Sequence, residues 1–140
     1  MPLTIEIVTP ARKVFSSAAD SVVLPAKSGQ LGILPGHIPL VVLLNPGEVV
    51  VTHGAKTEQI VVDQGFARVL GDVVSILTEA AIDTDDIDLD AVSKAEAEAI
   101  AAIAEARDSK GGEEQEAELE RLAQILRFSA AQKLYRPGAR

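Results

Sequence analysis

Hydrophobic and polar residues follow the pattern of β-strands over the first 84 residues of the chain. Leu3, Ile5 and Ile7 alternate with Thr4 and Glu6, which is the period of a strand with one buried face. Further short runs rich in β-branched residues are Val22–Leu24, Val41–Leu44, Val49–Val51, Ile60–Val62 and Val73–Leu77. Each of these runs predicts one strand.

Turn-forming residues separate the runs at short and regular intervals. They are Pro10, Ser16–Ser17, Lys27–Gly29, Pro35–Gly36, Pro46–Gly47, Gly54, Gln64–Gly65 and Gly71–Asp72. The pair Gly29 and Gly32 is interpreted as a sharp turn, because glycine adopts the positive φ that turns require. Regular short strands without a helix between them predict an antiparallel β-sandwich, or flattened barrel, for residues 1–84.

The pattern changes after residue 84 and predicts an antiparallel pair of α-helices over residues 85–140. Residues 91–106 are rich in alanine and contain neither glycine nor proline, which favours a helix. Acidic residues over 85–90 suit its N-terminus, and Lys110–Gly112 suits a turn that ends it. We expect helices at about 88–109 and 113–135, joined by this turn into a helical hairpin.

Both helices carry an apolar stripe, but the first stripe consists mostly of small residues. The stripes are Val92, Ala95, Ala99, Ile103 and Ala106 on the first helix, and Leu119, Leu122, Leu126, Ala130 and Leu134 on the second. Small side chains bury little apolar area, at about 25 cal/mol per Å². A hairpin of this size is also too small to be stable alone. We therefore expect it to pack on the sandwich or on another protein, weakly enough to move.

Charge excludes one class of partner and singles out one end of the chain. The 140 residues contain 13 Lys+Arg against 21 Asp+Glu, a net charge of −8, which argues against nucleic-acid binding. Most of the negative charge lies over residues 85–120, whereas residues 121–140 contain no acid. The basic residues of this last segment are Arg121, Arg127, Lys133, Arg136 and Arg140. They fit an acidic protein surface, and equally the ordinary complement to a helix C-terminus.

Residue types that carry catalysis are scarce. The absence of cysteine excludes disulfides and thiolate chemistry, and the histidines are His37 and His53 alone. No phosphate-binding loop or nucleophile motif is present, so we expect neither catalytic residues, a metal nor a cofactor. His37 suits a loop histidine that bonds to its own turn or a contact residue. We find no signal peptide and no membrane-spanning segment, so we expect a soluble chain without membrane insertion.

One string in the first half carries a family resemblance. It runs Gly29-Gln30-Leu31-Gly32-Ile33-Leu34-Pro35-Gly36-His37-Ile38-Pro39-Leu40, and is followed by Pro46-Gly47, Gln64-Gly65-Phe66 and Val73–Leu77. With the strands-then-helices layout, the chain resembles the epsilon subunit of bacterial rotary F-type ATP synthases along almost its whole length. The resemblance implies a non-catalytic subunit of the central stalk, which couples the gamma subunit to the c-ring during rotation.

The resemblance also implies contact residues and a location. Thr9, Gln30 and His37 match the surface of the family that faces the c-ring and gamma. The hairpin would contact the alpha/beta hexamer through its basic residues and restrain ATP hydrolysis; these residues are Arg121, Arg127, Lys133 and Arg136. The chain would then lie at the cytoplasmic face of the bacterial inner membrane as a peripheral subunit.

A nucleotide-binding motif of some family members is degenerate here. Asp88 and Arg127 match that motif, but Ala91, Glu98 and Ala123 stand where the motif has arginines. Without guanidinium groups to hold phosphates, nucleotide binding should be severely weakened, and the hairpin is expected not to sense ATP physiologically.

Two other functions are compatible with the residues alone. A free-standing β-sandwich adaptor would bind an acidic protein partner through the basic tip of its hairpin. A sandwich that binds a small molecule would need a polar cluster facing inward, and the strands look too uniformly apolar for one.

Overall fold

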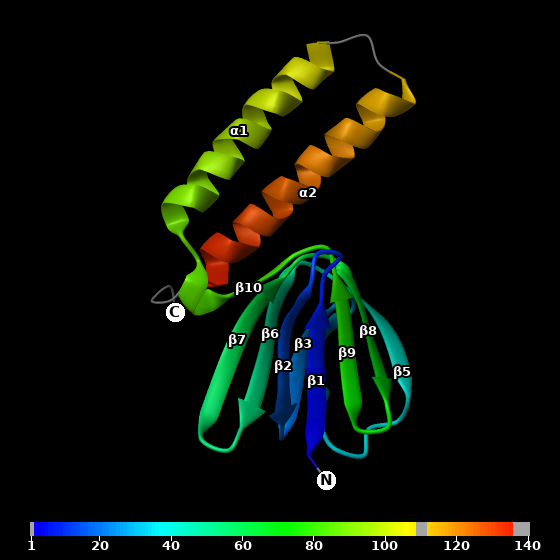
Figure 1. Ribbon diagram of the computed structural model, residues 1–140. Coiled ribbons are helices and arrows are strands. Elements are labelled where there is room, and N and C mark those ends of the chain that lie inside the picture. Colours follow the sequence, from blue (N-terminus) through cyan, green and yellow to red (C-terminus); the bar gives the residue numbers. More distant parts are fainter. Residues whose placement is uncertain (1, 109–111, 136–140) are drawn as a thin grey trace.

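A ten-stranded sheet is followed by two helices in the computed structural model, which describes residues 2–108 and 112–135 (Figure 1). The strands are β1 (Leu3–Val8), β2 (Lys13–Ala19), β3 (Ser21–Ala26), β4 (Gly29–Ile33), β5 (Leu40–Leu44), β6 (Gly47–His53), β7 (Lys56–Val62), β8 (Gly65–Leu70), β9 (Val73–Thr78) and β10 (Ala81–Asp83). A short 3₁₀ turn, Thr84–Asp86, leads to α1 (Leu89–Asp108) and α2 (Glu113–Tyr135). No helix among the described residues is long and apolar enough to cross a bilayer.

The sheet curls into a barrel-like sandwich, which confirms the predicted fold class. Its strand order is β10-β7-β6-β3-β5-β8-β9-β1-β2, with β4 beside β3. Within the described residues, neighbouring strands pair antiparallel except β1 with β9, which are parallel. The expectation of a purely antiparallel sheet was wrong at this one pair. The chain returns to the free edge of β1 only after seven further strands, and it arrives there running in the same direction.

The core lies between the two walls of the sandwich and consists of aliphatic side chains. The alternation that predicted the first strand is confirmed, since Leu3, Ile5 and Ile7 are fully buried while Thr4 is exposed. The largest buried side chains elsewhere in this core are Val22, Leu24, Ile33, Val49, Ile60, Val62, Val69 and Ile76. All of the residues in this core cluster belong to the strands, so the sandwich has a core that is independent of the helices.

Two segments interpreted as turns are strands instead. Ser16 and Ser17 lie in β2, where they pair with Glu6 and Ile5. Small polar residues are tolerated there because β2 lies at an edge of the sheet. The Gly29–Gly32 segment belongs to β4, and of its residues Gly29 has a positive φ of 128°. The actual turn is at Lys27–Ser28, so the positive φ completes the turn as the strand begins.

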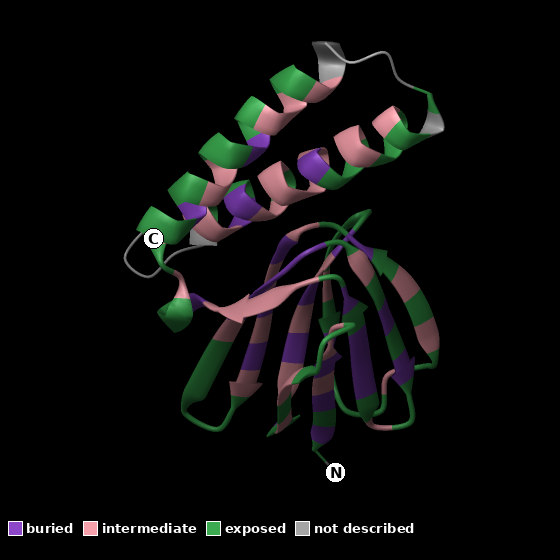
Figure 2. Cartoon of the chain, turned by 45° about the horizontal axis from the view of Figure 1, so that its top comes forward, coloured by how far each residue is buried: buried purple, intermediate pink, exposed green. Residues whose placement is uncertain are grey.

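The helices pack against each other as an antiparallel pair, and α2 lies across one end of the sandwich, over β6 and β7 (Figures 1 and 2). Val92, Ala99 and Leu122 are buried, as their stripes predict. Ala130 and Leu134 were expected to face inward but are exposed, whereas Ser129 and Ala131 are buried. The stripe is offset because α2 has two neighbours, α1 and the sandwich. In the expected Lys110–Gly112 turn, Lys110 and Gly111 lie outside the described residues.

The sandwich thus has two distinct ends. The helix-side end, next to α2, carries the turns at residues 9–12, 27–28, 45–46 and 63–64. The far end carries the loops at residues 34–39, 54–55 and 71–72. The candidate contact residues are distributed between these two ends.

Candidate functional site

An apolar surface covers the outside of β5, β8 and β9. In an antiparallel sheet with one solvated face, the outward side chains are usually polar. Here outward positions are apolar as well, and Val41, Leu43 and Leu70 are 67%, 57% and 57% exposed. We call this surface the outer apolar face, and it consists of Val8, Val41, Leu43, Phe66, Leu70, Val73 and Leu77. Contiguous exposed apolar surface of this kind marks a protein interaction site.

The strand register arranges this face in rows. Leu43 pairs with Phe66, Phe66 with Leu77, and Leu77 with Val8, so one apolar row crosses four strands. Leu70 pairs with Val73 and forms a second, shorter apolar row. Cross-strand neighbours lie close enough for their side chains to touch. Each row is therefore continuous across strands that are far apart in the sequence.

A polar row separates the two apolar rows. Arg68 and Ser75 pair with each other, and Ser75 pairs with Glu6 across the parallel ladder. The Ser75 hydroxyl donates a hydrogen bond to Glu6 at 3.1 Å, and the Lys13 ammonium lies 3.4 Å from the same carboxylate. Polar groups within an apolar face can fix the register of a partner.

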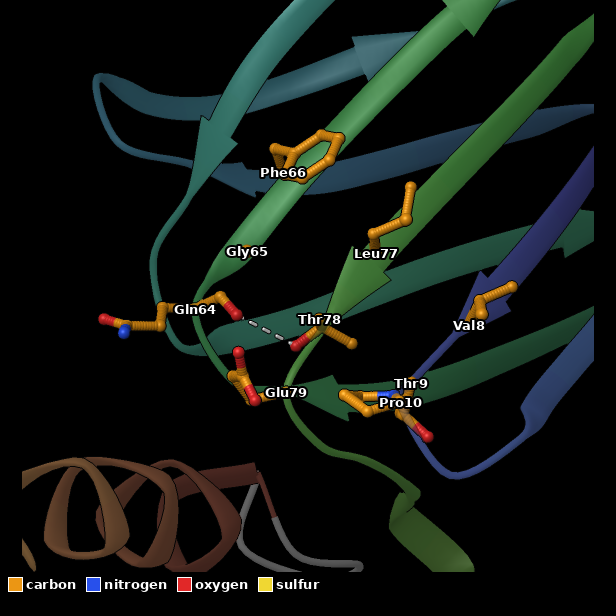
Figure 3. Close-up of a pocket in the computed structure, with 9 residues that line it drawn as sticks. All are labelled: Val8, Thr9, Pro10, Gln64, Gly65, Phe66, Leu77, Thr78 and Glu79. Carbon is orange, nitrogen blue, oxygen red and sulfur yellow. Dashed lines mark hydrogen bonds between the residues drawn. The ribbon is translucent and has the colours of Figure 1, made fainter. Parts of the chain in front are cut away.

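A hollow of about 370 Å³ lies where the long apolar row meets the helix-side end (Figure 3). Its apolar wall is formed by Val8, Phe66 and Leu77. Its remaining lining is Thr9, Pro10, Gln64, Gly65, Thr78 and Glu79. A side chain on residue 65 would collide with the Leu77 carbonyl oxygen, so the hollow depends on glycine at that position. The hollow is large enough to admit an apolar side chain from a partner protein.

Thr9 and Gln30 lie at the helix-side end. The Thr9 hydroxyl and backbone N–H both donate to the Arg12 carbonyl, at 3.1 and 2.9 Å, and close the turn between β1 and β2. Thr9 also lines the hollow. Gln30 is exposed on β4 opposite Pro25.

His37 lies at the far end, so the structure does not bring the three candidate contact residues together. Its backbone N–H donates to the Leu34 carbonyl at 3.1 Å, and its Nδ1 lies 2.7 Å from the Ile38 carbonyl. Leu34 and Ile38 are 62% and 73% exposed, so His37 is surrounded by a second, smaller apolar surface.

The described cations of α2 pair with carboxylates of the hairpin itself. Arg121 binds Glu118 at 2.7 Å, Arg127 binds Glu120 at 3.0 Å, and Lys133 binds Glu96 at 2.7 Å. Residues 121–140 contain no acid, but folding supplies acids from earlier in the chain. Arg136 lies outside the described residues.

The Arg121 pair also affects protonation. The hydrogen bond from Arg121 lowers the pKa of the Glu118 carboxyl, and the same bond raises the pKa of the guanidinium. Both side chains are solvent-accessible, so the pair contributes little to stability.

Asp88 and Arg127, the remnants of the nucleotide motif, line different surfaces. The Asp88 Oδ1 accepts hydrogen bonds from the backbone N–H groups of Asp90 and Ala91, at 3.0 and 3.2 Å, and so caps α1. A hollow beside it is lined by Asp86, Asp88, Ala91, Val92, Ser129 and three neighbouring residues, none of them basic. Arg127 instead lines a groove with Pro46 on the other side of α2. Carboxylates beside the cap oppose an anionic ligand.

No group of three or more histidine, aspartate or glutamate side chains forms a metal site within the described parts of the chain. The outer apolar face was not identified from the sequence, because β8 was not predicted as a strand. A signal was present in the runs Val41–Leu44 and Val73–Leu77, in which successive residues are mostly apolar. Successive side chains of a strand point to opposite faces of the sheet, so such a strand has apolar side chains on both faces.

Comparisons with known proteins agree with this architecture. Residues 2–84 match the family model described as "ATP synthase, Delta/Epsilon chain, beta-sandwich domain". An ATP synthase epsilon chain of Acidithiobacillus ferridurans is 37% identical over 143 residues, which covers 99% of this chain and 96% of that protein. One from Nitratidesulfovibrio vulgaris is 45% identical over 93 residues, covering 66% of this chain and 69% of that protein.

A solved structure shares the fold. A chain in the cryo-EM structure of the Euglena gracilis mitochondrial ATP synthase, "OSCP/F1/c-ring in rotational state 1", superposes with a TM-score of 0.70 at 24% identity. The match covers 94% of this chain and 79% of that one. With the family model over the whole sandwich and a relative matched from end to end, the chain belongs to the family of ATP synthase epsilon chains, which are non-catalytic subunits of that complex.

Proposed function

We propose that this chain is a central-stalk subunit that couples the gamma subunit to the c-ring, and that its outer apolar face is the surface that binds gamma. The observation that carries the proposal is the apolar row that crosses four strands, in which Leu43, Phe66 and Leu77 are exposed and Val8 is half-buried. Burying apolar surface drives stable protein association. Family membership identifies an ATP synthase as the complex in which such a partner would be found.

Substitution in this row tests the gamma surface. Leu43→Glu places a carboxylate in the middle of the long apolar row and should weaken binding to purified gamma by about tenfold or more. Thr57→Glu is the matched control, because it adds the same charge at an exposed position on β7. Affinities measured by pull-down and calorimetry should separate the two variants. Equal binding by both variants would contradict the gamma surface.

The c-ring is the second partner that we propose, at one end of the sandwich. Thr9 and Gln30 lie at the helix-side end and His37 at the far end, so a ring stacked on one end would contact only one of these groups. The chain contains no cysteine, so single-cysteine variants Gln30→Cys and His37→Cys can be crosslinked to the ring without background. One of them should crosslink to subunit c, and failure of both would exclude contact at either position.

We further propose that the hairpin restrains ATP hydrolysis by contacting the alpha/beta hexamer, with Arg121, Arg127, Lys133 and Arg136 as its basic contacts. The carboxylate partners of Arg121, Arg127 and Lys133 would have to be exchanged for acids of the hexamer. Deleting residues 85–140 should raise hydrolysis by the assembled enzyme and leave assembly intact. Unchanged hydrolysis would remove the inhibitory role and leave the coupling role standing.

Nucleotide sensing is not part of the proposed function. Asp86 and Asp88 line the hollow beside the α1 cap, where phosphates would meet negative charge. Calorimetry of the isolated chain with Mg-ATP should show no binding at micromolar concentrations. The chain itself would lie on the cytoplasmic face of the bacterial inner membrane, held there by its partners.

A further inference from the structure

Asp63 forms a buried carboxylate at the corner between β7 and β8, on the helix-side end. It is 4% exposed. Its backbone N–H donates to the Ala80 carbonyl at 2.9 Å, and its own carbonyl accepts from the Thr78 hydroxyl at 2.8 Å. Its Oδ1 accepts the backbone N–H of Gln64 at 2.7 Å. These three bonds all stay within the sandwich.

The fourth bond leaves the sandwich. Oδ2 of Asp63 accepts a hydrogen bond from the Gln124 side-chain amide of α2 at 3.2 Å. None of the ion pairs between described residues includes Asp63, so a neutral amide faces this buried carboxylate. A buried carboxylate that loses a hydrogen-bond donor carries a large desolvation penalty. The Gln124 contact therefore matters more to the packing of α2 than an exposed hydrogen bond would.

The groove between α2 and Pro46 is lined by small or exposed apolar side chains of the helix. On the sandwich side of α2, Ala130, Ala131 and Leu134 line a groove with Pro46 and Arg127. Of the three apolar helix residues, Ala131 is buried, whereas Leu134 is 64% exposed. Alanine side chains bury little area, so this groove provides little specificity for one position of the helix. The hydrogen bond to Asp63 adds specificity, because the geometry of a buried acceptor is satisfied at one position of the helix.

The two helices hold each other more firmly than α2 holds the sandwich. Lys133 of α2 pairs with Glu96 of α1, and each helix has a buried apolar residue, Leu122 on α2 and Ala99 on α1. The Gln115 amide also donates to the Ala106 carbonyl at 2.6 Å. Neither of these polar contacts involves the sandwich, so both can persist if α2 leaves it.

We propose that the Asp63–Gln124 pair is the latch that holds the helical hairpin on the sandwich, and that breaking it releases the two helices as one body. The latch is a property of the free chain. Its consequence for hydrolysis rests on the inhibitory role proposed above, since a released hairpin is free to reach the hexamer. The unlatching variant is Gln124→Glu, which places a second carboxylate against Asp63.

A distance measurement tests the latch in the full-length chain. Because the chain has no cysteine, spin labels can be attached at Thr57→Cys on β7 and Ala117→Cys on α2. Pulsed electron resonance should show one label-to-label distance in the parent chain. In Gln124→Glu, a second and longer distance should gain population by about five- to a hundredfold.

Two further variants make the result specific. Asp63→Asn combined with Gln124→Glu reverses the direction of the bond, because the amide at position 63 then donates to the carboxylate at position 124. This double variant should restore the single distance. Gln59→Glu on β7 adds the same charge at a half-buried glutamine outside the latch and should leave the distance unchanged. Far-UV circular dichroism checks that every variant retains its strands and helices.

The outcomes separate the latch from the inhibitory role. A Gln124→Glu chain with the parental distance distribution would overturn the latch, and so would a double variant that stays open. If Gln124→Glu opens the hairpin but hydrolysis by the assembled enzyme is unaltered, the latch stands and the inhibitory role fails. If the two helices separate from each other, release as one body is wrong.

Discussion

Single backbone positions determine whether the outer apolar face can form. Gly65 begins β8 at the place where the hollow opens, and a Cβ there would overlap the Leu77 carbonyl oxygen and lie 2.8 Å from Thr78 Cα. Both of these are backbone atoms, which cannot rotate away as a side-chain tip can. The pairing of β8 with β9 therefore requires glycine at this position.

Gly65→Ala should lower the free energy of unfolding by about 1–3 kcal/mol, because the β8–β9 ladder must shift to admit the methyl group. Thermal or denaturant unfolding measures the change. Gly32→Ala is the matched control, since Gly32 also lies in a strand but has no positive φ and nothing within 4 Å of the place that a methyl group would occupy. A Gly65 variant as stable as the Gly32 variant would contradict the close approach.

Protonation of Glu118 provides a test of the hairpin ion pairs. Arg121 donates to this carboxylate and lowers its pKa, so the pair is intact above the ordinary glutamate range and is lost as pH falls through the lowered pKa. In Arg121→Gln the pKa of Glu118 should rise toward its ordinary value, as followed by NMR of the carboxyl carbon. Arg127→Gln should leave it unmoved, because Arg127 pairs with Glu120.

The partners in these ion pairs could not be predicted from the sequence. The basic residues can be read from the sequence, but their partners depend on distances that only folding defines. Lys133 reaches Glu96 on the other helix, 37 residues away in the sequence. A count of charges along the segment therefore predicts an unpaired basic tip, whereas in the structure its described cations form ion pairs.

Among the elements, the hairpin depends on very few buried side chains. Leu122 is the largest side chain that is buried in the described parts of the helices, and the other buried apolar residues there are Val92, Ala99 and Ala131. Small neighbours cannot collapse into the space that a lost leucine leaves.

Leu122→Ala should therefore destabilise the packing of the helices by about 2–5 kcal/mol. Hydrogen exchange should show faster exchange along α1 and α2, while amides of the β core remain protected. Leu134→Ala is the control, because Leu134 is largely exposed and its truncation should change little. Uniform loss of protection through the strands would show instead that helices and sandwich unfold together.

Strands with a clear hydrophobic signal could be predicted, and strands without one could not. The alternation of Leu3, Ile5 and Ile7 gives β1, and the β-branched runs give β3, β5, β6, β7 and β9. β2 and β4 have exposed positions that are occupied by serines or glycines, so their composition gives no strand signal. They form strands because they pair with the neighbouring strands β1 and β3. Local propensity is informative only where burial is strong.

At the scale of the whole molecule, the core is confined to the sandwich. Every residue of the core cluster lies between Leu3 and Ala81, and the helices contribute none. The hairpin, in contrast, depends on the sandwich through a small seam and the Asp63 bond. The two parts should therefore differ in their ability to fold alone.

A chain of residues 1–84 should retain a cooperative thermal transition, whereas the peptide 85–140 should lose most of its helical ellipticity when isolated. Circular dichroism of both fragments beside the full chain measures this difference. Full helicity in the isolated peptide would mean that the seam between the helices suffices without the sandwich.

The arrangement of contact residues emerges only at this largest scale. Thr9, Gln30 and His37 are close enough in sequence to suggest one surface, but the direction of each strand places His37 at the opposite end from the other two. Strand direction follows from the complete topology, which no local pattern contains.

The parallel pairing of β1 with β9 has a consequence for synthesis of the chain. β1 can pair with β9 only when Val73–Leu77 have been synthesised. Until then, while the sandwich is still emerging from the ribosome, one edge of β1 stays unpaired. Pairings between such distant segments also slow folding, toward milliseconds to seconds. During that interval the exposed β1 edge is open to pairing with other nascent chains, and its shortness and the bulge between Ile7 and Val8 limit such pairing.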